Sequence, residues 1–159
     1  MALVKGTNSY ADLAEAEAYF ADRLDVAAWE SATDPQKEQA LVTATSILDD
    51  MSWTGIAASE SQLTAFPRIG EYFDPRLGLD AFLDGVDIPD RIVKATYELA
   101  YHFLNNDGIL DSTGAVDSIS VGPIKLEGIQ SSGQIPSNVL RMVKPLRTNG
   151  GSSVWWRAN

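Results

Sequence analysis

The sequence predicts a mainly α-helical fold: a small bundle of three to four main helices, then a short β hairpin and an extended C-terminal arm. Apolar residues recur at helical spacing over residues 12–24, 35–51 and 89–105. Apolar and polar residues alternate around a Gly-Pro break over residues 118–127, which is typical of a hairpin. The charge pattern separates the arm, because all 22 Asp and Glu residues lie before residue 128.

The first helix is predicted over residues 12–24. Asp12 is a suitable N-cap, and Glu15 follows at the spacing of a capping box, in which the two ends of the motif satisfy free backbone N–H groups. One face of this helix collects the residues expected in the core, which are Leu13, Ala16, Tyr19 and Phe20.

The second helix is predicted from Pro35 to about Met51. Asp34 is expected to cap it, and Pro35 fits the first helical position, where its missing N–H has no cost. Trp29 and Trp53 flank this helix and are expected to anchor the core. Its apolar positions are Ala40, Leu41, Ala44, Ile47 and Leu48.

Residues 52–88 show no sustained period and are interrupted by glycine and proline, so a long connection with short helical turns is expected. Its expected anchors in the core are aromatic: Trp53, Phe66, Tyr72, Phe73 and Phe82. A strongly amphipathic helix follows from Pro89 to Asn105, with an apolar face of Ile92, Val93, Thr96, Leu99, Ala100, Phe103 and Leu104.

The end of the chain is predicted to hold two short strands at 118–127, a flexible linker at 131–134 and a last helix at 136–147. Pro145 is expected to weaken the end of that helix. The charge pattern suggests two parts. Residues 1–127 carry 22 acidic and 8 basic residues and form an acidic helical body, whereas residues 128–159 carry four basic residues and no acidic one and form a docking arm.

Composition excludes several classes of protein. With 45% hydrophobic and 21% charged residues the chain is typical of soluble globular proteins, and no apolar run approaches the roughly 20 residues of a membrane span. The N-terminus lacks the pattern of a secretory signal, and the absence of cysteine excludes disulfides and thiolate-bound metals. A net charge of −10 repels the phosphate backbone of nucleic acids, so tight DNA binding by the body is not expected.

No catalytic, metal-binding or cofactor-binding residue is predicted, and the chain is not expected to be an enzyme. His102 is the only histidine and has no second ligand or orienting partner at a useful spacing. Neither a phosphate-binding glycine loop nor a nucleophile elbow occurs. A dense acidic stretch does not fit the calcium-loop pattern and is expected to be a solvated surface with helix caps: Asp74, Asp80, Asp84, Asp87 and Asp90.

The C-terminal arm holds the residues predicted to dock on a partner. Trp155 and Trp156 lie beside Arg157 and outside any periodic element, and aromatic and arginine residues are frequent interface hot spots. With the other basic residues of the arm, the predicted docking set is Arg141, Lys144, Arg147, Trp155, Trp156 and Arg157.

Several short motifs in a fixed order resemble a family of small tailed-phage virion proteins, the head-tail connectors or adaptors, some of which are labelled DnaT-like single-stranded-DNA-binding proteins. The resemblance covers about residues 8–127. Its motifs are Asn8-Ser9-Tyr10, Ala14 to Phe20, Asp34 to Leu41, Trp53-Thr54-Gly55, Phe66-Pro67-Arg68, Ile88-Pro89 and Val121-Gly122-Pro123-Ile124.

The resemblance implies a helical protein that is made in the bacterial host and assembles into a ring, commonly of twelve copies, beneath the portal protein of the virion. Tail or neck proteins would be its further partners, and genomic DNA would pass through its lumen without specific binding. No catalytic residue is implied. The alternative is a single-stranded-DNA-binding accessory protein of phage replication, with Lys144, Arg147 and Arg157 on phosphates and Trp155 and Trp156 stacked on bases.

Overall fold

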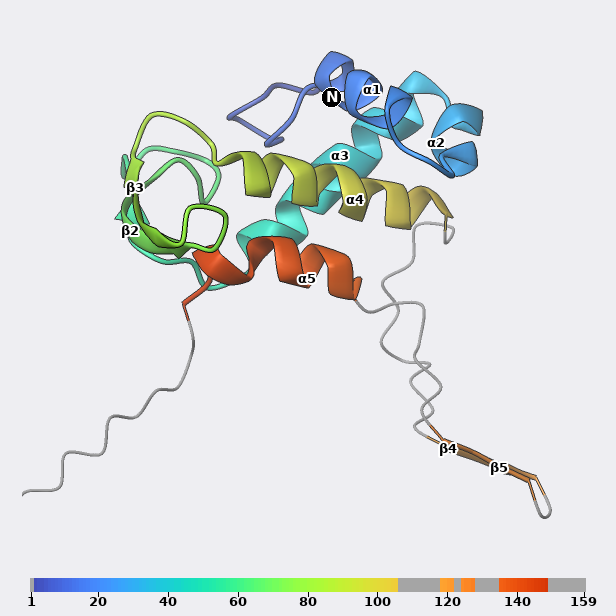
Figure 1. Cartoon of the computed structure of the whole chain (residues 1–159). Coiled ribbons are helices and arrows are strands. Elements are labelled where there is room, and N and C mark those ends of the chain that lie inside the picture. The colour runs from blue at the N-terminus through green and yellow to red at the C-terminus, as the bar shows by residue number, and fades with distance from the viewer. Residues whose placement is uncertain (1, 106–117, 122–123, 128–134, 149–159) are drawn as a thin grey trace, which may run out of the picture.

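The computed structural model describes residues 2–105, 118–121, 124–127 and 135–148, and it confirms the mainly α-helical fold with a small β component (Figure 1). The helical segments are α1 Leu13–Ala21, α2 Ala27–Ser31, α3 Asp34–Asp49, α4 Asp90–Asn105, α5 Ser137–Val143 and the 3-10 turn η2 Lys144–Leu146.

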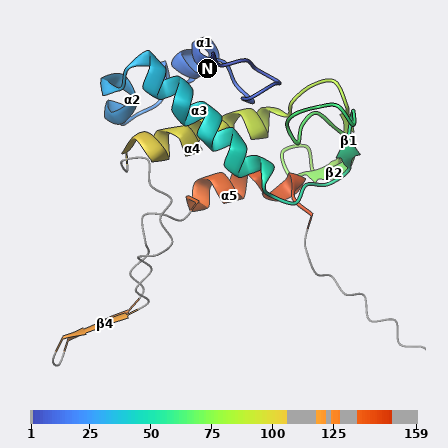
Figure 2. The same ribbon diagram turned by 180° about the vertical axis from the view of Figure 1, so that it is seen from behind.

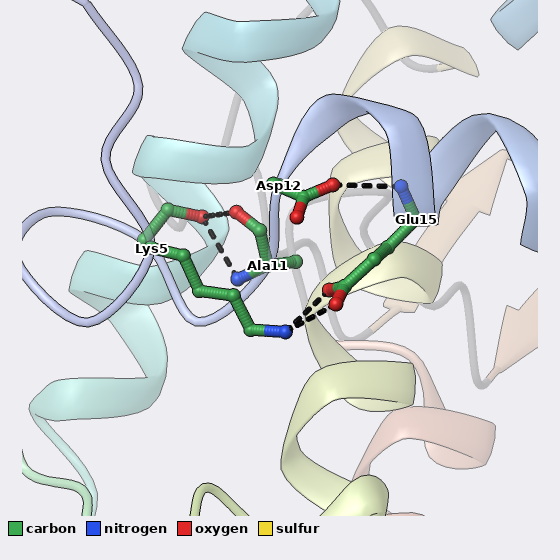
Figure 3. A network of polar contacts seen from close by, with 5 residues as sticks. Lys5, Ala11, Asp12 and Glu15 are labelled. Carbon is green, nitrogen blue, oxygen red and sulfur yellow. Dashed lines mark hydrogen bonds and ion pairs between the residues drawn. The ribbon is translucent and has the colours of Figure 1, made fainter.

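Helix α1 begins where the sequence predicts, because the Asp12 carboxylate accepts a 2.7 Å hydrogen bond from the backbone N–H of Glu15 (Figure 3). The other half of the predicted capping box is wrong. The Glu15 carboxylate binds the ammonium group of Lys5 at 2.5 Å instead, and this contact ties the N-terminal loop to the first turn of the helix. The helix also ends earlier than predicted, at Ala21.

The N-cap of α3 is Thr33, and the prediction that Asp34 caps this helix is wrong. Asp34 is already its first residue, so Pro35 follows at the second position. The side-chain oxygen of Gln36 accepts hydrogen bonds from the backbone N–H and from the hydroxyl of Thr33, each 2.9 Å long. A glutamine three residues after threonine makes a capping box. With this box the helix begins after Thr33, and Asp34 is not its cap.

The core lies between α3 and α4, with α5 packed along α4 (Figures 1 and 2). Most residues of the predicted apolar faces of α3 and α4 are buried, whereas Ile47, Val93 and Leu104 are half-buried. Trp29, Trp53 and Phe66 are core residues as expected. Trp29 belongs to α2, a short helix that the sequence analysis did not predict. The largest fully buried side chains are those of Trp29, Tyr10, Phe20, Phe66, Leu41 and Leu48.

Residues 56–84 form a three-stranded antiparallel sheet, so the expectation of short helical turns in this segment is wrong. The strands are β1 Ile56–Ala57, β2 Arg68–Asp74 and β3 Leu79–Asp84, in the order β1-β2-β3. Strands β2 and β3 form a hairpin in which Glu71 pairs with Phe82 and Phe73 pairs with Asp80. The sheet lies at one end of the helices, where α4 begins and where α3 and η2 end (Figures 1 and 2).

Not all the aromatic residues of this segment anchor it. Tyr72 is half-buried against the core, whereas Phe73 and Phe82 have exposed fractions of 55% and 65%. Adjacent residues of a strand point to opposite faces of the sheet, so Tyr72 and Phe73 cannot both face the core. The prediction that Phe73 and Phe82 are core anchors is therefore wrong.

The strands predicted at 118–127 are confirmed as β4 Ser118–Val121 and β5 Ile124–Glu127, paired antiparallel. The last helix is also confirmed. Its α-helical part ends at Val143, and Pro145 lies in the following 3-10 turn, as expected for a residue that cannot continue the hydrogen-bond pattern.

Candidate nucleic-acid interface

Most cations of the acidic body are already neutralised by a carboxylate. Arg23 lies 2.8 Å from Glu98, Lys37 lies 2.6 Å from Glu17, and Lys94 lies 2.7 Å from Asp90. With Lys5 held by Glu15, these cations have partners within the fold. They therefore contribute little to binding an external anion unless their partners are displaced.

Arg68 is satisfied in a different way, by backbone carbonyl groups of the segment that enters the sheet. Its guanidinium donates to the carbonyl oxygens of Thr54 at 2.9 Å and of Gly55 at 2.6 Å. The side chain thereby joins β2 to the connection before β1, and its role is structural.

Asp74 is the best-enclosed carboxylate of the predicted acidic stretch and is not the solvated residue that was expected. It is buried and accepts hydrogen bonds from the backbone N–H of Arg76 at 2.9 Å and from the guanidinium of Arg91 at 3.3 Å. The bond from the Arg76 N–H, followed by those from Arg91, keeps the pKa of Asp74 below its usual value. Asp84 does not cap a helix as expected: its carboxylate accepts from the backbone N–H of Val86 at 2.9 Å, in the loop that follows β3.

Three cations at the C-terminal end of the described fold are different. Arg141, Lys144 and Arg147 are exposed, and none of them has a carboxylate within ion-pair distance in the part of the chain that the structure describes. They recur every three residues along α5 and η2, a spacing that places them on neighbouring positions of a helical surface. We call these three residues the cationic ridge.

Apolar residues of α5 and η2 hold the ridge in place. Val139, Val143 and Leu146 are fully buried, which fixes one face of α5 and η2 on the core and leaves the charged face to solvent. Backbone contacts secure the end of η2. The N–H of Thr54 donates to the carbonyl of Leu146 at 2.9 Å, and the N–H of Thr148 donates to the carbonyl of Ser52 at 3.1 Å.

A buried glutamate also positions α5. The Glu98 carboxylate on α4 accepts hydrogen bonds from the Tyr19 hydroxyl at 2.7 Å and from the side-chain amide of Asn138 at 3.3 Å, in addition to its pair with Arg23. One side chain therefore connects α1, α4 and α5. Burial, and then the hydrogen bond to Glu98, raise the pKa of Tyr19 well above its usual value.

A pocket of about 590 Å³ lies beside the ridge, between β2, the start of α4 and α5. Met142, next to Arg141, forms part of its wall, and Tyr72 contributes an aromatic ring from the sheet. Three cations and two carboxylates also line it, so its charged residues sum to one positive charge. The lining residues are Tyr72, Asp74, Arg76, Pro89, Asp90, Arg91, Lys94 and Met142.

Three of the six residues in the predicted docking set lie in this arrangement. Arg141, Lys144 and Arg147 of the predicted docking set form the ridge, whereas Trp155, Trp156 and Arg157 lie outside the described residues. The sequence analysis missed the pocket, because Tyr72 and Arg91 come together only through the packing of the sheet on α4 and have no common motif. Residues 137–146, which the charge pattern assigns to the arm, pack against the helical core.

No group of three or more histidine, aspartate or glutamate residues is placed to hold a metal ion among the residues that are described. In the same part of the chain, no helix has the length and apolar character needed to cross a bilayer. His102 lies near the end of α4 and is half-buried.

Comparison with known proteins gives one result. The model of a family described as "Putative DnaT-like ssDNA binding protein" matches residues 2–158. No curated protein and no solved structure matches the chain. The family match does not extend to the head-tail connectors, so the connector resemblance stays a prediction.

Proposed function

We propose that this chain, which belongs to the DnaT-like single-stranded-DNA-binding protein family, binds single-stranded DNA through the cationic ridge. One observation carries the proposal. In a described body whose other cations are mostly satisfied by carboxylates or carbonyls, the three ridge cations are exposed and have no carboxylate partner. Phosphate groups are the ligands that such a row of cations favours.

The arrangement suits a single strand better than a duplex. Proteins that bind single strands combine a row of cations for the backbone with aromatic side chains on which bases stack. The ridge supplies the cations, and Tyr72 in the adjacent pocket supplies a candidate stacking surface. The remainder of the body is acidic and repels phosphate, which confines the strand to this edge of the molecule. No step of this function requires a catalytic residue.

The direct test is the affinity for a fluorescein-labelled single-stranded oligonucleotide, measured by anisotropy at low salt. Replacing all three ridge cations with serine is expected to weaken binding about tenfold or more, because each lost phosphate contact removes its share of counterion release. Lys144→Ser and Lys5→Ser form a matched pair. Both remove one exposed lysine, but Lys5 is already paired with Glu15, so only Lys144→Ser should weaken binding. Equal losses from the two variants would contradict the assignment of the ridge.

A second candidate function is the structural adaptor of a tailed-phage virion, and a different observation favours it. The outward face of the three-stranded sheet exposes Ile56, Phe73 and Phe82, with exposed fractions of 68%, 55% and 65%. Clusters of exposed apolar side chains are typical of protein interfaces. In this proposal the chain forms a ring, commonly of twelve copies, at the head-tail interface of the virion. The portal and the tail or neck proteins are its partners.

Sedimentation of the protein with purified portal complexes separates the two candidates. Comigration as a ring would support the adaptor, and the ridge variant should then still comigrate. If the protein does not comigrate with portals but binds single-stranded DNA, the first proposal is supported. Failure to bind DNA even at the lowest salt would remove that proposal, because electrostatic binding is strongest there.

A further inference from the structure

The outward face of the sheet has no partner among the described residues, although it is rich in apolar groups. Side chains alternate between the two faces of each strand, and the pairings Ile56 with Ile69 and Glu71 with Phe82 place these residues on one side. We call this side the outer sheet face. It comprises Ile56, Ile69, Phe73 and Phe82, together with the carboxylates of Glu71 and Asp80.

The composition of this face limits what can cover it. Two exposed phenylalanine rings favour aromatic partners, which pack edge-to-face or in offset stacks. The carboxylates of Glu71 and Asp80 disfavour a nucleic acid and favour a cation. An occupant that is aromatic, basic and free of acidic residues therefore fits best.

We propose that residues 149–159 of the same chain cover the outer sheet face, with Trp155 and Trp156 packed on Phe73 and Phe82 and Arg157 beside the carboxylates. This segment contains two tryptophans, one arginine and no acidic residue. It therefore supplies the aromatic and basic side chains that the outer sheet face favours in an occupant. The proposal does not depend on DNA binding, because the ridge and the outer sheet face have no residue in common. It competes with the adaptor function, since a face covered by the arm is not available as an interface.

The position where the described chain ends supports a contact within one molecule. Thr148 is hydrogen-bonded to Ser52, and Arg147 forms a β-bridge with Trp53, so the arm departs beside the segment that enters β1. Figures 1 and 2 show η2 ending next to the sheet.

The arm is also long enough. Trp156 is the eighth residue after Thr148, which corresponds to a reach of about 26 Å at roughly 3.3 Å per extended residue. The sheet is about 10 Å wide from β1 to β3, because neighbouring strands are about 4.8 Å apart. The reach of the arm therefore exceeds the width of the sheet, as a contact between the tryptophans and Phe82 on the far strand requires.

The test uses ¹⁹F NMR of the full chain labelled with 5-fluorotryptophan. Its four tryptophan signals are assigned with Trp155→Phe and Trp156→Phe. At least one arm signal is expected to be shifted from its position in a free peptide of residues 149–159. The double variant Phe73→Ser with Phe82→Ser should return that signal to the free-peptide position. Both replaced side chains are exposed, so the fold should persist, and the signals of Trp29 and Trp53 report whether it does.

The control variant is Leu24→Ser, which removes an apolar side chain that is 90% exposed at the opposite end of α4. It should leave the arm signals unchanged. Arm signals that match the free peptide in the wild-type protein would overturn the proposal. A shift that disappears on dilution would overturn it as well, because the occupant would then be the arm of a second copy.

Discussion

Tyr10 illustrates how a single buried side chain makes stability depend on pH. Its ring is fully buried, and its hydroxyl donates a hydrogen bond to the Asp49 carboxylate, which also accepts from the backbone N–H of Ala65 at 2.9 Å. Burial, and then the contact with Asp49, raise the pKa of Tyr10 far above its usual value of 10.0. The folded protein thus keeps this hydroxyl protonated under conditions in which the unfolded chain ionises it.

The consequence is a loss of stability in alkaline solution. Above pH 10 the unfolded chain binds fewer protons than the folded one, so the free energy of unfolding falls as the pH rises. One such group contributes a slope of about 1.4 kcal/mol per pH unit. We expect Tyr10→Phe to make the decline above pH 10 shallower by about that amount. Urea denaturation at pH 9 to 11 measures the slope, and an unchanged slope would contradict the assignment.

Gly55 illustrates a backbone contact that tolerates no side chain. It has a φ angle of +78°, and a Cβ atom at this position would lie 2.3 Å from the carbonyl oxygen of Ile69. Gly78 also has a positive φ angle, +69°, but a Cβ atom there would meet nothing within 4 Å. The two glycines therefore separate the cost of the backbone conformation from the cost of the clash.

We expect Gly55→Ala to lower the free energy of unfolding by about 3 kcal/mol or more, and Gly78→Ala by only about 1 kcal/mol. Chemical denaturation of the two variants gives both values. Similar losses would mean that the approach of Gly55 to β2 is looser than the structure shows.

At the residue scale, the sequence predicts side chains whose partners are close along the chain. Asp12 as an N-cap needs only a neighbour three residues away, and it is confirmed. The preference of Glu15 for Lys5, and the burial of Asp74 between Arg76 and Arg91, depend on the tertiary fold. No local pattern distinguishes these carboxylates from solvated ones.

At the scale of elements, Glu98 links α5 to the first part of the chain. Its carboxylate is buried and joins Tyr19 of α1, Arg23 in the turn after α1 and Asn138 of α5. Replacing it leaves a partly buried guanidinium and a phenol without their acceptor, and unpaired buried groups cost more than a surface contact gains.

We expect Glu98→Ala to lower the free energy of unfolding by about 2 to 3 kcal/mol. Asp90→Ala is a suitable control, since Asp90 and its partner Lys94 are both exposed, so losing their ion pair should cost less than about 1 kcal/mol. Thermal denaturation compares the two variants. Equal costs would show that the Glu98 network does not secure α5.

Helices and strands differ in how well the sequence predicts them. The face of α4 repeats over many residues and is confirmed, and the hairpin at 118–127 shows a clear alternation. The sheet at 56–84 was missed because its exposed face is also apolar, so Tyr72 and Phe73 mask the alternation of a half-buried strand. The turn between β2 and β3 contains Pro75 and Gly78, and these residues are as typical of a long loop as of a hairpin turn.

At the scale of the whole molecule, charge is distributed according to position along the chain. The body carries all 22 Asp and Glu residues and pairs most of its cations, whereas the last described helix carries cations that no described carboxylate satisfies. The asymmetry is visible in the sequence. The sequence does not show that the unpaired cations form one exposed ridge beside a pocket. Their position depends on the packing of α5, which Val139, Val143 and Glu98 hold in place.

The salt dependence of binding to single-stranded DNA tests the central claim most directly. For single strands the slope of log affinity against log salt is about −0.7 per phosphate contact, so three ridge cations correspond to a slope of about −2. The account predicts that the wild-type slope is steeper by about that amount than the slope of the variant in which Arg141, Lys144 and Arg147 are serine. Identical slopes, or no binding by the wild-type protein at the lowest salt, would contradict it.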